Sequence, residues 1–171
     1  MNSFVSVLTA NLLLNKGPQD FPCSQVLMKL SLAAYFVSGL PGLMITVDFP
    51  QAVFAMALDV VVLLVFVYLC LQAFAKSERF VQSVISLASM GTVFQLLVFP
   101  LILNFDTSPE VIQQMLGLSI LMLLVVSWNL AVFAHLFKES FGVRLPAAIV
   151  LTICYILLNL LARQIFFSGL T

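Results

Sequence analysis

Residues 52–74 read AVFAMALDVVVLLVFVYLCLQAF, and this stretch decides the fold. It holds one charged residue, Asp59, in a run that meets the length of about 20 apolar residues needed to cross a bilayer core. Its centre, VVVLLVF at residues 60–66, does not alternate polar and apolar side chains as the strands of a transmembrane barrel do. Since only helices and closed barrels satisfy their backbone polar groups in lipid, the stretch predicts a transmembrane helix.

The same pattern occurs four more times, over residues 24–47, 80–103, 111–137 and 145–167. Each stretch is long enough to span about 30 Å of hydrocarbon at about 1.5 Å per residue. The sequence therefore predicts an all-α fold, a polytopic transmembrane bundle of five helices over residues 24–167.

The two ends of the chain differ from this transmembrane domain. Residues 1–23 form an N-terminal segment whose first fifteen residues are largely apolar but too few to span a bilayer. We expect a short interfacial helix there, ended by Lys16-Gly17-Pro18, with a disordered tail as the alternative. Residues 168–171 form a short C-terminal tail.

Prolines and small residues predict how two of these helices pack. Pro41 and Pro100 lie inside the first and third predicted helices, where we expect a kink or local unwinding. The third helix also carries a series of small residues, which permit a neighbouring helix to approach closely. These are Ser83, Ser86, Ala88, Ser89 and Gly91.

Composition excludes several classes of protein. The chain of 171 residues is 63% hydrophobic and 8% charged, with a formal net charge of zero. A soluble domain is about 45–50% apolar and about 25% charged. So little charge excludes a soluble enzyme, a disordered tail and a nucleic-acid binder, which needs a basic face. Membrane lipids are the expected surroundings.

Reactive and metal-ligating residues are few. The chain has three cysteines, with no C-x-x-C pair, and one histidine. We therefore expect no zinc or iron–sulfur site and no other cofactor. No phosphate-binding loop, nucleophile elbow or H-E-x-x-H motif is present, so we expect no enzymatic activity.

The distribution of charge predicts the orientation of the helices. If the N-terminus is cytoplasmic, the two outer connections carry Asp48, Asp106 and Glu110 without any lysine or arginine. Of the basic residues near helix ends, only Arg163 then lies toward the outside. The positive-inside rule thus predicts a cytoplasmic N-terminus and an outer C-terminus. The basic residues on the inner side are Lys16, Lys76, Arg79, Lys138 and Arg144.

Polar residues inside the predicted helices form the first candidate site. Asp59 and Arg163 fall at similar depths from the outer side, with Asn159 one turn from Arg163. We expect an ion pair between them, supported by a hydrogen bond from Asn159. The pair is either a gated or ion-coupling polar site, or a contact that only fixes helix packing. Alternatively, Arg163 extends to the surface and Asp59 is protonated.

The fourth predicted helix supplies a second set of candidates, for helix–helix or partner contacts: Trp128, Asn129 and His135. Asn129 is expected to hydrogen-bond a neighbouring helix, with a substrate contact as the alternative. His135 falls in the last predicted turn, where an interfacial position and the helix dipole suit it. A proton relay would need more titratable groups than the chain provides.

The predicted layout resembles that of Yip1-like membrane proteins, which have five helices and a short cytoplasmic N-terminal segment. Residues 16–22 (KGPQDFP) and 127–135 (SWNLAVFAH) also resemble segments of uncharacterised proteobacterial inner-membrane proteins. The resemblance implies a bacterial inner-membrane location and a role as a membrane-embedded partner or organiser. It implies no catalytic residues.

Two functions are compatible with these features. The first is a non-catalytic interaction or accessory subunit within the bilayer, bound to a membrane-protein partner or to copies of itself. The alternative is a small transporter or channel component with a polar site at Asp59, Asn159 and Arg163. A transporter requires a polar cavity that reaches the middle of the membrane, whereas an interaction protein is expected to have a dry core.

Overall fold

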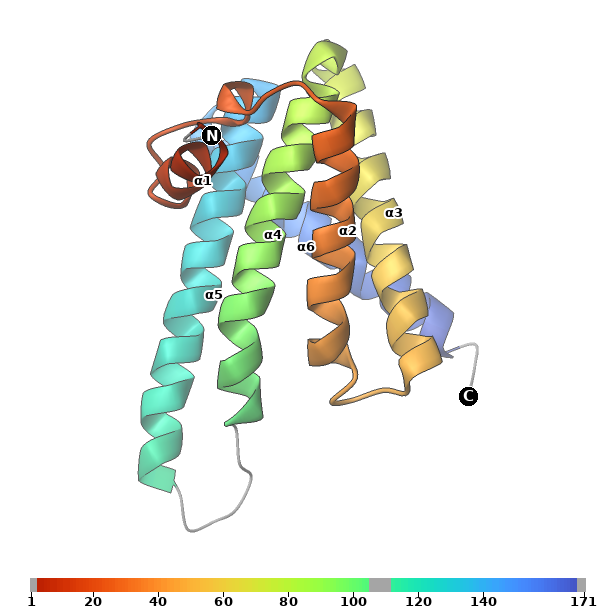
Figure 1. Cartoon of the computed structure of the whole chain (residues 1–171), viewed down its shortest axis with the longest axis vertical. Helices are drawn as coiled ribbons and strands as arrows, with labels where there is room; N and C mark the ends of the chain where they lie inside the picture. Colours follow the sequence, from red (N-terminus) through yellow and green to blue (C-terminus); the bar gives the residue numbers. More distant parts are fainter. Residues whose placement is uncertain (1–2, 105–111, 169–171) are drawn as a thin grey trace.

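The computed structural model describes residues 3–104 and 112–168, and every regular element in these ranges is helical (Figure 1). Five helices, α2 to α6, are long and apolar enough to cross a membrane. The predicted all-α fold, with five such helices and a short N-terminal helix, is confirmed. In chain order the elements are α1 (Ser3–Leu12), the 3₁₀ helix η1 (Pro18–Asp20), α2 (Gln25–Leu43), α3 (Phe49–Ala73), the 3₁₀ helix η2 (Ser77–Arg79), α4 (Phe80–Leu103), α5 (Ile112–Phe141) and α6 (Leu145–Ser168).

The end of α2 and the start of α3 differ from the predicted boundaries, and a proline lies near each. α2 stays helical through Pro41 and ends at Leu43, short of the predicted residue 47. α3 begins at Phe49, before the predicted residue 52. Its Pro50 falls in the first turn, where the missing N–H leaves no hydrogen bond unmade.

α5 is longer than the sequence predicted. It continues past residue 137 to Phe141 and is followed by Gly142, whose φ of +64° is the left-handed conformation that glycine commonly supplies after a helix. The extension places His135 well before the end of the helix rather than in its last turn. The predicted outer acids Asp106 and Glu110 and the tail residues 169–171 lie outside the described residues.

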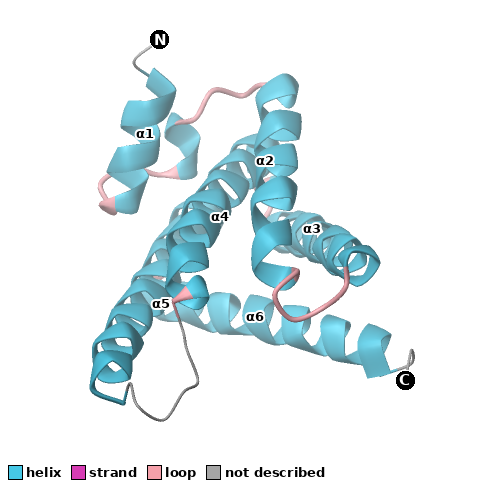
Figure 2. Ribbon diagram, turned by 60° about the horizontal axis from the view of Figure 1, so that its bottom comes forward, coloured by secondary structure: helices cyan, strands magenta, loops and turns pink. Residues whose placement is uncertain are grey.

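The spanning helices form a bundle in which α2 packs most extensively against α4, α4 also contacts α5, and α5 contacts α6. α3 lies against α2 and α6, and α6 crosses obliquely behind the other helices (Figures 1 and 2). The N-terminal segment and the α3–α4 and α5–α6 turns lie at one end, and the α2–α3 turn lies at the other (Figure 1).

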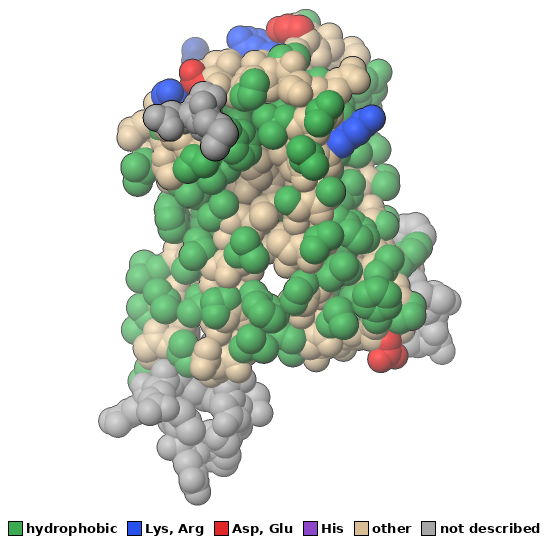
Figure 3. Space-filling model, viewed as in Figure 1, with side chains coloured by type: hydrophobic (Ala, Val, Ile, Leu, Met, Phe, Trp, Pro, Cys, Tyr) green, Lys and Arg blue, Asp and Glu red, His purple; other side chains and the backbone are tan. Residues whose placement is uncertain are grey.

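Side-chain chemistry follows this arrangement. On the face shown in Figure 3, apolar side chains cover the length of the bundle, and lysine and arginine gather at the end that carries the N-terminal segment. Many leucines, isoleucines and valines of the spanning helices are exposed, as expected for surfaces that face lipid. A small opening also passes through the molecule in this view (Figure 3).

Close packing of α2 on α4 depends on the small residues predicted for this role. Ser83, Ser86, Ala88, Ser89 and Gly91 are all buried. Ser89 donates a hydrogen bond to Ser31 of α2 at 3.2 Å. A Cβ atom on Gly91 would overlap the ring of Tyr35, so glycine is needed for the ring to lie against α4.

The N-terminal segment packs against α4 and α5. Val7 of α1 and Phe21, which follows η1, are buried at 5% and 1% exposure. The Gln82 amide of α4 donates hydrogen bonds to the carbonyl oxygens of Phe21 and Gln19, at 2.8 and 3.2 Å. The segment is therefore attached to the bundle by both apolar and polar contacts.

Candidate functional site

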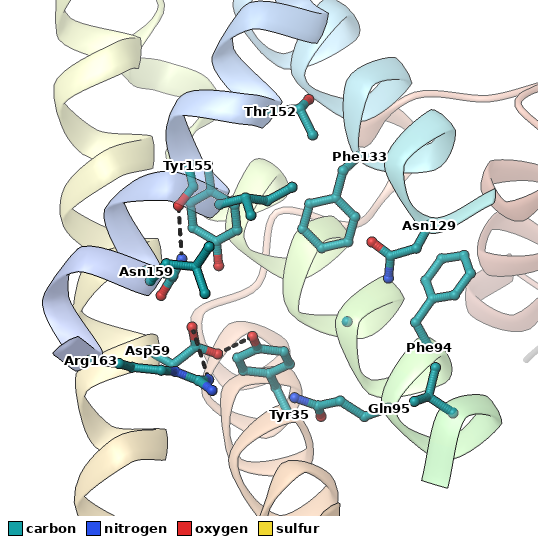
Figure 4. Close-up of a pocket in the computed structure, with 14 residues that line it drawn as sticks. Tyr35, Asp59, Phe94, Gln95, Asn129, Phe133, Thr152, Tyr155, Asn159 and Arg163 are labelled. Atoms are coloured by element: carbon teal, nitrogen blue, oxygen red, sulfur yellow. Dashed lines mark hydrogen bonds and ion pairs between the residues drawn. The ribbon is translucent and has the colours of Figure 1, made fainter. Parts of the chain in front are cut away.

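A cavity of about 320 Å³ lies within the bundle, and each of the five spanning helices contributes a polar side chain to its wall (Figure 4). Apolar residues, among them Phe94 and Phe133, line the remainder. The polar members are Tyr35 of α2, Asp59 of α3, Gln95 of α4, Asn129 of α5, and Thr152, Tyr155, Asn159 and Arg163 of α6.

The cavity lies near the middle of the helices. Asp59 and Tyr155 each lie ten residues after the first residue of their helix, a rise of about 15 Å at about 1.5 Å per residue. This rise is about half of a bilayer core of about 30 Å. Polar and ionisable groups at such depth are costly and are typical of functional sites.

Asp59 is the centre of the polar contacts. It is 6% exposed, and one of its carboxyl oxygens accepts a hydrogen bond from the Tyr35 hydroxyl. Its other oxygen lies 3.8 Å from Nη2 of Arg163, so the predicted ion pair is present. Tyr35 was not among the predicted site residues. Its position in the middle of a spanning helix was the available signal, because a buried tyrosine hydroxyl usually finds a partner.

Arg163 retains unused hydrogen-bonding capacity. Its side chain is 35% exposed, but its Nε atom is buried and has no hydrogen-bond partner among the described residues. Guanidinium groups present five N–H donors, and the 3.8 Å contact with Asp59 is longer than a hydrogen bond. Donors of Arg163 are therefore available to a molecule in the cavity.

Arg163 also lines a second, adjacent cavity of about 220 Å³. Gln95, Val98 and Arg163 line both cavities. The second cavity reaches Leu43 and Ile102, close to the ends of α2 and α4 that lie opposite the N-terminal segment. The two cavities thus extend from mid-depth toward one end of the bundle, with Arg163 at their junction.

Asn159 does not make the predicted hydrogen bond to the ion pair. Its amide donates instead to the backbone carbonyl of Tyr155, one turn earlier, at 3.1 Å. A polar side chain in a helix can satisfy itself locally in this way, and sequence spacing does not reveal the choice. The hydroxyl of Tyr155 points toward Asp59 and Tyr35 instead (Figure 4).

Asn129 lines the cavity, and its carboxamide makes no hydrogen bond with any described residue. The interhelical hydrogen bond expected of it is therefore absent from the described part of the chain. Gln95, in contrast, accepts a hydrogen bond from Ser38 of α2 at 2.5 Å. The site thus combines fixed polar groups with an amide that is available for binding.

Trp128 and His135 contact the N-terminal segment of the same chain. The Trp128 indole donates a hydrogen bond to the carbonyl oxygen of Leu12 at 3.1 Å. Nε2 of His135 lies 2.9 Å from the carbonyl oxygen of Lys16. Both side chains thus satisfy carbonyl groups at or beyond the end of α1, where helices leave carbonyls unpaired. Neither belongs to the cavity around Asp59.

Metal-ligating side chains do not gather in the described ranges: no group of three His, Cys, Asp or Glu residues is placed to hold an ion there. The cavity instead offers one carboxyl group, one guanidinium group, amides and hydroxyls. Such groups can bind and orient a polar molecule through hydrogen bonds.

The chain has the fold of a polytopic α-helical membrane protein with a polar cavity inside its bundle. Comparison with protein-family models, with curated proteins and with solved structures finds no match. The resemblance to Yip1-like proteins therefore stays a prediction.

Proposed function

We propose that the protein is a small transporter or channel component that holds a polar solute in the cavity around Asp59. The observation that carries this proposal is the contribution of a polar side chain to one cavity by each of the five spanning helices. A protein that served only as an accessory subunit would gain little from polar groups at this depth, since each is costly in lipid. The cavity therefore favours transport over the accessory-subunit function that the sequence placed first.

The lining points to the class of solute. The charges of Asp59 and Arg163 oppose each other within the wall, so the cavity suits a solute without net charge, either neutral or zwitterionic. Its volume of about 320 Å³ is at the lower end of the range of about 300–1,000 Å³ for small-molecule sites. Arg163 and Asn129 would supply hydrogen-bond donors, and Phe94 and Phe133 would cover the apolar part of the solute.

The junction at Arg163 supports a role for the ion pair in access. Arg163 lines both cavities, so a change in its contact with Asp59 would alter the wall that the two cavities share. With the predicted orientation in a bacterial inner membrane, the second cavity lies toward the periplasmic side. The proposal includes this orientation and this location.

Thiol labelling tests whether water reaches the cavity. Cys23, Cys70 and Cys154 are changed to serine, and Asn129→Cys is then introduced. The protein is reconstituted in vesicles and treated with a membrane-impermeant methanethiosulfonate reagent on each side in turn. We expect Asn129→Cys to react from one side, because the residue lines the cavity.

The control is Ser86→Cys, at a position of α4 that has 0% exposure and does not line the cavity. We expect this variant to react at least tenfold more slowly. Equal, slow reaction at both positions would show a dry interior. That result would contradict the transport proposal and would return the accessory-subunit function to first place.

A further inference from the structure

A groove of about 530 Å³ lies between α5 and α6, near the turn that joins them. Its lining is mainly apolar and includes Leu14 from the N-terminal segment. Ile149 and Ile153 of this lining are 45% and 50% exposed, so the groove opens to the surface that faces lipid. The other apolar members of the lining are Leu130, Ala131, Ala134 and Leu145.

The dimensions of the groove match part of a lipid chain. On α5 it extends from Leu130 to Lys138, and on α6 from Leu145 to Ile153. Eight residues of helix rise about 12 Å at about 1.5 Å per residue. This length is most of one leaflet of a bilayer core that is about 30 Å thick. The groove is therefore long enough to hold most of the part of an acyl chain that lies in one leaflet.

Two basic residues lie at the end of the groove by the α5–α6 turn, and one of them is paired with an acid. Lys138 lines this end, and Arg144 immediately precedes the lining residue Leu145. Arg144 is exposed and has no ion pair among the described residues, whereas Lys138 contacts Glu139 at 3.1 Å. The N-terminus of α6 lies at the same end and also favours an anion, although Pro146 in its first turn has no N–H group.

The N-terminal segment forms one wall of the groove. Leu14 has a φ of +60°, a conformation rare for residues other than glycine. Backbone hydrogen bonds from Leu14 to Asn11 and from Asn15 to Ala10, at 3.0 and 2.8 Å, hold this turn. The contact between His135 and the Lys16 carbonyl holds the segment beside α5. The wall is thus a defined part of the fold.

We propose that this groove binds an anionic phospholipid, with an acyl chain along α5 and α6 and the phosphate group near Lys138 and Arg144. The apolar lining recognises the chain, and the two cations with the helix N-terminus recognise the phosphate. The inference is independent of the solute cavity, because the two linings share only Thr152. Thr152 therefore lies in the wall between the two sites. Its hydroxyl donates a hydrogen bond to the Ala148 carbonyl at 2.9 Å.

Lipid retention by the purified full-length protein tests the proposal. The protein is equilibrated with equal amounts of phosphatidylglycerol and phosphatidylcholine that carry the same acyl chains, and the retained lipid is counted by native mass spectrometry. We expect phosphatidylglycerol to be retained at least threefold over phosphatidylcholine. Equal retention of the two lipids would overturn the proposed headgroup site.

Two pairs of variants locate the site. Ala131 is exposed and lines the groove, so Ala131→Phe should fill it and lower phosphatidylglycerol retention several-fold. Ala33→Phe is the control, at an exposed position of α2 that does not line the groove. Lys138→Gln with Arg144→Gln should remove the preference for the anionic lipid, whereas Lys29→Gln, which removes one cation from α2, should leave it intact.

Other outcomes overturn the proposal. If Ala131→Phe retains phosphatidylglycerol as the unmodified protein does, or if Ala33→Phe loses it equally, the groove is not the binding site. Displacement of the lipid by millimolar inorganic phosphate would identify a simple anion site without a role for the chain. Circular dichroism spectra and gel-filtration profiles that match those of the unmodified protein ensure that each variant is folded.

Discussion

Replacement of Gly91 by alanine tests how the structure positions Tyr35 beside Asp59. A Cβ atom on Gly91 would overlap Cδ2 and Cε2 of the Tyr35 ring. The ring is rigid, so a shift away from Gly91 would disturb the hydrogen bond between its hydroxyl and the Asp59 carboxyl. Insertion of an extra methyl group into a packed interior costs about 1–3 kcal/mol. Alanine also stabilises a helix by about 1 kcal/mol relative to glycine. The net loss of stability is therefore about 0–2 kcal/mol.

A matched control separates these two effects. A Cβ atom on Gly117 of α5 would meet nothing within 4 Å, so Gly117→Ala should gain only the helix preference of about 1 kcal/mol. The difference between the two variants then measures the clash alone, about 1–3 kcal/mol. The free energies of unfolding are measured by titration with sodium dodecyl sulfate from mild-detergent micelles, followed by circular dichroism.

A second substitution checks the cause. Gly91→Ala combined with Tyr35→Leu removes the ring that the new methyl group would meet, so the clash should disappear in this background. If Gly91→Ala proves as stable as Gly117→Ala, the close approach of Tyr35 to α4 is wrong, and the placement of its hydroxyl at Asp59 loses its support.

The contacts around the cavity and the N-terminal segment lead to three more expected outcomes. Tyr35→Phe should lower the free energy of unfolding by about 0.6–1.7 kcal/mol, the range for interhelical hydrogen bonds in membranes, whereas Tyr68→Phe, at an exposed tyrosine, should not. Arg163→Leu should lower the free energy of unfolding more in the unmodified protein than in one that already carries Asp59→Leu. We expect a coupling of about 0.5–3 kcal/mol in this double-mutant cycle. Additive losses would contradict the ion pair. Trp128→Phe removes the donor to the Leu12 carbonyl and should speed hydrogen exchange in α1; unchanged exchange there would contradict the attachment of the segment.

The number and position of the spanning helices followed directly from the sequence. Lipid allows only helices and closed barrels, so a long apolar run without alternation has one structural solution. The predicted helix boundaries were less accurate near prolines, which can lie either inside a helix end or just outside it. Pro41 is tolerated within α2 yet lies close to its end, and Pro50 falls inside the first turn of α3 rather than before it.

The candidate site was only partly predictable. Asp59 and Arg163 are the two charged residues that fall deep in the predicted helices at similar depth, so their pairing followed from the cost of an isolated charge. The contribution of Tyr35 depends on the rotation of α2 about its axis, which is set by contacts such as the one at Gly91. A sequence without a strong amphipathic pattern does not determine this rotation, because lipid and protein interior are similarly apolar.

The balance of satisfied and unsatisfied polar groups separates a binding site from a packing contact. An ion pair that served only to hold α3 against α6 would be expected to satisfy both partners, since unmade hydrogen bonds inside a membrane are costly. Asp59 meets this expectation through Tyr35 and Arg163, but Arg163 does not, because its buried Nε has no partner among the described residues. Asn129, across the same cavity, likewise makes no hydrogen bond with a described residue. Donors left available on two sides of one cavity are of use to a polar molecule that enters it, and packing alone gives no reason for them.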